Sequence, residues 1–403
     1  MTDDVSISVN GQIISGWTRI RITRGIERMP ADFEIEMTEP YANNSVAVAP
    51  GSSCKVFIGK NIVLSGYVDV YEIRIEGNDH TVSISGRSMS EDLVDCSAEY
   101  PNAQIMSQSV LQIVQALATT PYGIKVSQNS FPDQTKNTIP QISLMYGETA
   151  VELIQRICRF AGLLFYDMPD GSILLTTASS QKAASGFQEG VNVQSATARF
   201  TMNRYSDYIC VLQSIISTSD GQSLNSGQNN SMNQFFDSQD GSVPRNRKKF
   251  IVVESGDYEN LGGVEYPVTH QRAIWENNRR YGKAFEARVV TDNWRDSAGN
   301  LWAPNTLADL NLPTLKIPKS TWLISEVTYS LDGSGGTTAT LTLNPAQAFI
   351  PEPIVLIPNP IPEGLQNSTG AQIPTPAHIT ADQLVAPSVA QIAQDSTVIG
   401  ATK

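Results

Sequence analysis

Two pairs of carboxylates have side chains that could do chemistry. Glu91 and Asp92 are adjacent, and Asp167 stands three positions before Asp170. Paired acids can hydrolyse glycosides, but this reaction needs a cleft and a set separation between the carboxyl groups. Glu91 and Asp92 equally fit the first turn of a helix, where the helix dipole favours negative charge. Asp167 and Asp170 fit a turn, so we expect structural roles for both pairs.

Residues 86–90, with the letters GRSMS, partly match a nucleophile elbow. The last position is Ser where that motif has Gly, and the flanking segments read as antiparallel strands. A serine nucleophile would also need a histidine base, and the three histidines are scattered. We expect Ser88 or Ser90 to cap a helix instead. The histidines are His80, His270 and His378.

No metal, nucleotide or cofactor site is predicted. The four cysteines have no short paired spacing, so we expect free thiols that are buried. No Walker loop and no Gly-x-Gly-x-x-Gly between a strand and a helix occurs. Residues 292–300 carry oxygen ligands but lack the order of a calcium loop, which favours a hairpin turn. The cysteines are Cys54, Cys96, Cys158 and Cys210.

A basic run stands out in an acidic chain: Arg245, Arg247, Lys248 and Lys249. It could contact DNA or an acidic neighbouring subunit, although four charges without interleaved aromatic residues are more typical of a solvated loop. The formal net charge is -12, so the chain as a whole repels phosphate backbones. Nucleic-acid binding is therefore not expected to be its main role.

Composition favours a protein that works through its interfaces. Charged residues make up 17% of the 403 residues, below the usual value of about 25%. Permanent interfaces are depleted in charge, which this composition matches. No apolar stretch approaches the roughly 20 residues of a membrane span, and no secretion signal is recognised, so we expect a soluble protein.

One core rarely exceeds about 300 residues, so a chain of this length is expected to form more than one domain. Its sequence patterns divide it into four segments. Residues 1–98 read as short strands with a hairpin at Asn10-Gly11, typical of a β-barrel. Residues 99–188 read as an α/β unit. One amphipathic helix there ends at Pro121, and another begins with a capping box at Thr149 and Glu152 and ends at Gly162. A hairpin follows at 163–177.

Strands resume in 189–349, which we expect to form a second antiparallel β-barrel. Its residues 217–241 are too polar to order themselves, so a long loop is predicted there. A helix is predicted at 270–281, and a Gly-rich turn at 333–336 closes the last hairpin. Residues 350–403 are rich in proline and favour an extended tail that lies on a partner surface.

Several motifs in order resemble the phage Mu type of baseplate hub protein. The resemblance runs from Val5 to Pro353, and the polar loop and the tail depart from it. In the first half the motifs are GWTRIRITR at 16–24, GRS at 86–88, DLVDCS at 92–97, ET at 148–149, LI at 153–154 and AGLL at 161–164. In the second half they are RAIWENNRR at 272–280, LWAPN at 301–305 and LIS at 323–325.

The resemblance implies a homotrimer in which two similar β-barrels per subunit form a ring with pseudo-sixfold symmetry. Such a ring joins a threefold central spike protein to the sixfold tail tube protein, with other baseplate and tape-measure proteins nearby. DNA would pass through its channel without specific binding, in a virion assembled in the host cytoplasm. The motifs carry no catalytic residues. A hub of a type VI secretion or other contractile injection machine, and a tail-associated cell-wall hydrolase, stay as alternatives.

Overall fold

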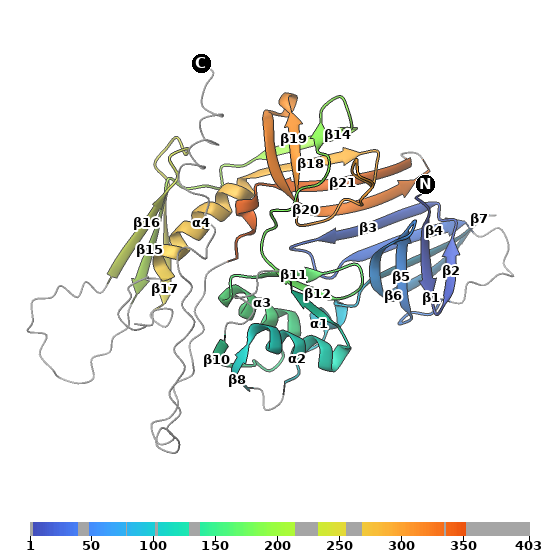
Figure 1. Ribbon diagram of the computed structural model, residues 1–403, viewed down its shortest axis with the longest axis horizontal. Coiled ribbons are helices and arrows are strands. Elements are labelled where there is room, and N and C mark those ends of the chain that lie inside the picture. The colour runs from blue at the N-terminus through green and yellow to red at the C-terminus, as the bar shows by residue number, and fades with distance from the viewer. Residues whose placement is uncertain are drawn as a thin grey trace, which may run out of the picture.

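The computed structural model describes residues 3–38, 48–77, 79–100, 104–128, 138–213, 233–254, 268–333 and 336–351 (Figure 1). The fold is mainly β, as predicted, and its largest element is a sheet of 13 strands that is antiparallel except for the pair β13–β19. Most of the helical structure lies in a separate segment below this sheet in Figure 1. The predicted tail lies outside the described residues from residue 352 onward. No described helix is long and apolar enough to cross a membrane.

The first β region contains seven strands. Asn10 and Gly11 both have positive φ, so the hairpin predicted there is confirmed. Alternation places Val5, Ile7 and Val9 in the core. The strands are β1 (Val5–Val9), β2 (Gln12–Ser15), β3 (Arg19–Gly25), β4 (Asp32–Thr38), β5 (Ser53–Ile58), β6 (Asn61–Glu76) and β7 (Asp79–Ser88).

The α/β segment follows, with its own hydrophobic core. The capping box at Thr149 and Glu152 is confirmed, and Gly162 has φ 66. Pro121 does not end its helix, contrary to the prediction, because it falls in the last turn, and the helix ends where Gly123 turns left-handed. The elements are α1 (Glu91–Asp95), β8 (Gln104–Ser109), α2 (Val110–Tyr122), β9 (Val126–Gln128), β10 (Thr138–Ser143), α3 (Ala150–Phe160), β11 (Leu164–Asp167) and β12 (Ile173–Thr176).

The second β region contributes the other six strands of the large sheet, and its final hairpin is found as predicted. Its first two strands are β13 (Phe187–Gln188) and β14 (Ser195–Phe200). The rest are β18 (Phe285–Thr291), β19 (Thr306–Leu312), β20 (Ile317–Asp332) and β21 (Gly336–Asn344), with short 3-10 helices η4 (Pro313–Leu315) and η5 (Ala346–Phe349).

An insertion separates β14 from β18. It forms a three-stranded sheet of β15 (Asp207–Gln213), β16 (Asn233–Gln239) and β17 (Lys248–Glu254), covered by α4 (Val268–Ala284). Two predictions fail here. Residues 233–239 of the expected polar loop form a strand, because pairing with β15 gives the backbone its hydrogen bonds whatever the side chains. Lys248 and Lys249 lie in β17 rather than in a solvated loop.

The two β regions repeat one strand order. The first reads β3-β4-β7-β6-β5 and the second β14-β18-β21-β20-β19, all antiparallel. In each, the first part of a 16-residue strand pairs with the strand before it and the later part with the strand after it. The ladder with the following strand contains a bulge, between residues 68 and 70 in β6 and between residues 324 and 326 in β20. We call residues 19–88 repeat 1 and residues 195–344 repeat 2.

The two repeats form one sheet because β3 of repeat 1 pairs with β20 of repeat 2. Their cores merge there: Ile22 and Val327 are fully buried in one hydrophobic cluster that includes both repeats. The pairing thus joins strands about 300 positions apart in the sequence. Closure of either repeat into a barrel stays a prediction.

Candidate functional site

Asp167 lies at the centre of a buried polar cluster that joins the α/β segment to repeat 1. Its side chain is at the end of β11 and only 2% exposed. One carboxylate oxygen accepts hydrogen bonds from the Ala31 amide (2.9 Å), from Ser90 Oγ (3.3 Å) and from Ser88 Oγ. The fold therefore brings the GRSMS motif to one of the predicted acids.

The expected cap is only partly found. Ser90 does occupy the N-cap position of α1, but its side chain makes no capping hydrogen bond. Its hydroxyl is directed to Asp167 instead, and so is that of Ser88. A hydrogen bond to a buried carboxylate is stronger than one to a neutral amide, which accounts for the difference.

Neighbouring contacts seat the β11–β12 hairpin on repeat 1. Ser65 Oγ donates to the Pro169 carbonyl at 2.9 Å. Gly171, at φ 85, lies against Met89 so closely that a Cβ would stand 2.6 Å from its sulfur. Asp170 accepts from the amide and hydroxyl of Ser172, which confirms its place in a turn. Asp167 and Asp170 thus have separate structural roles.

Glu91 belongs to a second, ionic cluster at the start of α1. Arg87 donates to Asp69 at 2.7 Å and to Asp95 at 2.8 Å, and lies 3.4 Å from Glu91. Burial, together with the charge of Asp69, raises the pKa of Glu91 to about 7 despite Arg87. Glu91 and Asp92 do occupy the first turn of a helix, as predicted.

The other candidate ligands are dispersed. All four cysteines are free, and three are buried as predicted, but Cys96 just after α1 is exposed, contrary to the prediction. Burial raises the pKa of Cys54 to about 12, so its thiol is protonated at neutral pH. Asp296 accepts hydrogen bonds from the amides of Ala298 and Asn300, so residues 292–300 form the predicted turn. Within the described ranges, no group of His, Cys, Asp or Glu could hold a metal ion.

The basic run meets α4. Lys249 and Arg280 both donate to Glu276 at 2.6 Å. Burial alone would raise the pKa of Glu276, but these two hydrogen bonds lower it overall. The cations of Arg247, Lys249 and Arg280 lie 5.0–5.6 Å from the centre of the Tyr205 ring. Sequence reasoning missed this aromatic partner, which lies 40 positions before the run.

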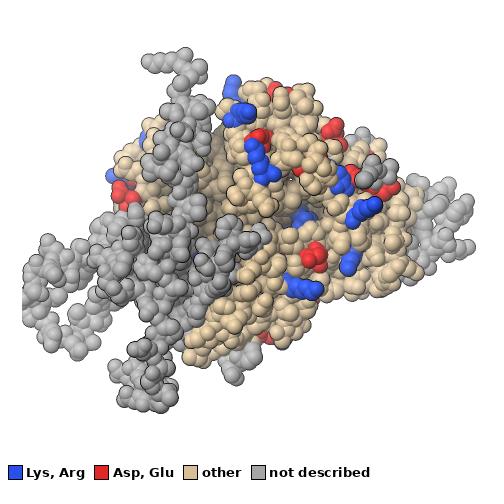
Figure 2. All heavy atoms as spheres, viewed as in Figure 1, with Lys and Arg blue, Asp and Glu red and all other residues tan. Residues whose placement is uncertain are grey.

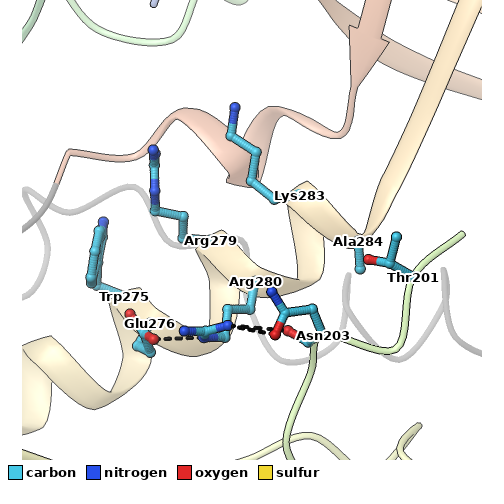
Figure 3. A pocket seen from close by; sticks show the side chains of 8 residues that line it. All are labelled: Thr201, Asn203, Trp275, Glu276, Arg279, Arg280, Lys283 and Ala284. Atoms are coloured by element: carbon cyan, nitrogen blue, oxygen red, sulfur yellow. Dashed lines mark hydrogen bonds and ion pairs between the residues drawn. The ribbon is translucent and has the colours of Figure 1, made fainter. Parts of the chain in front are cut away.

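A hollow of about 220 Å³ lies along α4 (Figure 3). Arg279 and Lys283 point to one side of the helix, and Arg280 with Glu276 to the other. Their charges are compensated, since Arg279 and Lys283 both pair with Glu27. The hollow is lined by Thr201, Asn203, Trp275, Glu276, Arg279, Arg280, Lys283 and Ala284.

The end of the described chain is fixed to α4 on the same side. Trp275 Nε1 donates to the Ile350 carbonyl at 2.7 Å, and Arg279 donates to the Ala348 carbonyl at 2.8 Å. Gly282 allows this close approach, because a Cβ there would stand 2.2 Å from the Ala348 nitrogen. The tail therefore begins on the surface of α4.

Surface charge is sparse on the face drawn in Figure 2, where basic and acidic residues are scattered among uncharged residues. This arrangement has the features of an assembly protein: repeated β-structure, salt-bridged polar joints and a surface with few charges.

Three family models match the chain. They describe the N-terminal domain of Mu phage baseplate assembly protein GpP-like proteins at residues 4–88, the second domain of baseplate hub protein gp44-like proteins at 90–177, and the fourth domain of Mu phage baseplate assembly protein GpP at 267–352. The baseplate hub protein gp44 of Escherichia phage Mu is 25% identical over 351 residues, which are 87% of this chain and 90% of that protein.

Solved structures give the same picture. The 43 kDa tail protein of prophage MuSo2 from Shewanella oneidensis is 29% identical, with a TM-score of 0.72 over 86% of this chain and 99% of that one. A tail protein from Neisseria meningitidis shares the fold at 20% identity, TM-score 0.68, over 87% and 98% of the two chains. A type VI secretion component from E. coli shares it at 13% identity, TM-score 0.55, over 88% and 81%.

The fold and these likenesses define a phage tail protein of the baseplate hub class. Within that class, the chain is a Mu-like baseplate hub protein, related in fold to the spike proteins of type VI secretion.

Proposed function

We propose that three copies of this chain form a ring with pseudo-sixfold symmetry that joins a threefold spike to the sixfold tail tube. The observation that carries the proposal is the internal repeat. Repeat 1 and repeat 2 have the same five-strand order and the same bulged strand of 16 residues. Three copies therefore present six similar β units, which is the number that a sixfold tube requires.

The insertion of β15–β17 and α4 supports the same division of symmetry. It lies between the first two strands of repeat 2, whereas β3 and β4 of repeat 1 are joined by only six residues, 26–31. A ring of three copies carries the insertion three times. The surface that it adds is threefold, and so matches a threefold neighbour rather than the tube.

The role is structural rather than catalytic, and the bonding of the acids supports this. Asp167 and Asp170 hold a hairpin in place, and Glu91 belongs to an ionic cluster with Arg87. The same proposal includes assembly in the host cytoplasm. It also includes passage of DNA through the ring without specific binding, because the acidic chain repels phosphate.

Sedimentation of the recombinant chain tests the proposal, alone and with its phage's spike protein. We expect a trimer in at least one mixture, and electron micrographs of rings with six units around a channel. A chain that stays monomeric alone and with the spike would rule the proposal out.

A further inference from the structure

Among the strand edges of the large sheet that lack a partner within the described residues, two occupy related places in the repeats. Beyond Val68, β6 pairs only with β7, and no strand in the described ranges lies along its other edge. β14 pairs only with β18 over the same described ranges. An unpaired edge exposes backbone N–H and C=O groups, which favours the addition of another strand.

These two edges are counterparts of the two strands that already pair inside the chain. In the shared strand order β6 corresponds to β20, and β14 corresponds to β3. The intrachain pair β20–β3 joins repeat 2 to repeat 1. A pairing of β6 with β14 from another copy would join repeat 1 of one subunit to repeat 2 of the next in the same way.

The ladder registers give the residue equivalences. Each bulge precedes the segment concerned, so Val70 on β6 corresponds to Glu326 on β20. Through the ladders of β3–β4 and β14–β18, Ile22 corresponds to Ala198. The observed pair Tyr329↔Ile22 therefore predicts Ile73 opposite Ala198 between copies.

Side-chain chemistry agrees with this register on the core side of the sheet. Ile73 is 53% exposed and Ile75 is 75% exposed, whereas their counterparts Tyr329 and Leu331 are buried and partly buried. The register places Ile75 opposite Ala196, and Tyr71 opposite Phe200, which is itself 49% exposed. On this side of the sheet, the exposed Ile73 and Ile75 would thus each meet an apolar residue of the neighbouring copy.

Charges agree with the register on the outer side. Inside the chain Thr328 lies opposite Thr23, and their hydroxyls are 3.2 Å apart. The corresponding residues between copies are Glu72 and Arg199, which have opposite charges and are both exposed. Opposite charges directly across an antiparallel pair stabilise it, and like charges destabilise it.

We propose that residues 70–76 of β6 in one copy add in antiparallel register to β14 in the next copy, with Glu72 opposite Arg199. Each copy gives one edge and receives the other, so the contact is head to tail. It closes at three copies because six similar junctions complete the ring, three within chains and three between them. This inference rests on the proposed trimer.

Disulfide cross-linking tests the register. In a Cys96→Ser background, the pair Glu72→Cys and Arg199→Cys should yield covalent dimers and trimers on a non-reducing gel, because the equivalent threonines touch. The matched control is Glu72→Cys with Glu286→Cys. Glu286 lies opposite Arg199 on β18, one strand farther away, at about 10 Å, which is too far for a disulfide.

Charge reversal tests the same contact without cysteines. We expect Arg199→Glu or Glu72→Arg alone to lower the trimer association constant by at least about tenfold, since three interfaces per ring are affected. The double swap should restore it. Lys60→Glu, in the exposed turn before β6, is the matched control and should leave association unchanged. Thermal unfolding of each variant checks that it is folded.

The outcomes separate the two proposals. The inference is supported if the wild type is trimeric, only the first cysteine pair forms cross-links, and the double charge swap restores the association constant. A trimeric wild type that shows neither effect overturns the inference and leaves the proposed ring intact. A chain that stays monomeric, alone and with the spike, overturns both.

Discussion

At the scale of single residues, Asp167 is expected to contribute strongly to stability. Three donors, from Ala31, Ser88 and Ser90, converge on its carboxylate in a buried site. Asp167→Ala leaves these donors without an acceptor, so we expect a loss of about 2–4 kcal/mol in the free energy of unfolding. Urea denaturation measures it. Asp170→Ala, at an exposed position in the nearby turn, is the control and should cost about 1 kcal/mol. Equal losses would contradict the role given to Asp167.

Glu91 should make stability depend on pH. Its folded pKa of about 7 lies above the ordinary value of 4.5, so the folded chain binds the proton more tightly than the unfolded chain. The protonated form therefore contributes stability that is full below about pH 4.5 and is lost as the pH rises through 7. After allowance for partial solvent screening, we expect a loss of about 1–2 kcal/mol between pH 5 and pH 8.

Replacement of Glu91 by Gln isolates this contribution. The amide keeps the size of the side chain but cannot ionise, so the variant should lose less stability than the wild type between the two pH values. Urea midpoints at pH 5 and pH 8 provide the comparison. Parallel pH profiles for the two proteins would show that another group titrates.

At the scale of elements, α4 and η5 are held together by a close contact at Gly282. Alanine usually stabilises a helix interior by about 1 kcal/mol relative to glycine. Here its Cβ would meet the backbone of Ala348 at 2.2–2.6 Å, so Gly282→Ala should instead destabilise the protein by about 1–3 kcal/mol. Calorimetry of this variant beside Gly241→Ala, where a Cβ meets nothing within 4 Å, tests the sign. A stabilised Gly282→Ala variant would contradict the contact.

Local elements were predictable where the signal is local. Asn10-Gly11 defines a hairpin, and Thr149 with Glu152 defines a helix start, because each needs only neighbours in the sequence. The strand β16 was not predictable from its composition, since its order comes from pairing with β15. Asp167 was recognised as a candidate, but its serine partners lie about 80 positions away, and no periodicity records such a contact.

At the scale of the whole molecule, the shared strand order of the two repeats could not be predicted from sequence patterns. Its two copies share strand order and bulge position but differ in residues: Phe33 corresponds to Ala287, and Gly86 to Leu343. The insertion between β14 and β18 also separates the strands of repeat 2 in the sequence. Two β regions were expected from strand spacing, whereas their union through β3 and β20 emerges only in three dimensions.

The tail can be tested as a separate unit of the molecule. All described cores are complete by Phe349, and η5 is anchored to α4 before the tail begins. Removal of residues 352–403 should therefore leave the melting temperature within about 2 °C of the full chain and the trimer intact.

If the tail lies on a partner surface, the truncated chain should bind other baseplate proteins more weakly. Calorimetry and sedimentation measure the first two properties, and baseplate assembly in a complemented phage measures the third. Normal assembly would show that the tail has another role, whereas a lower melting temperature would show that it belongs to the fold.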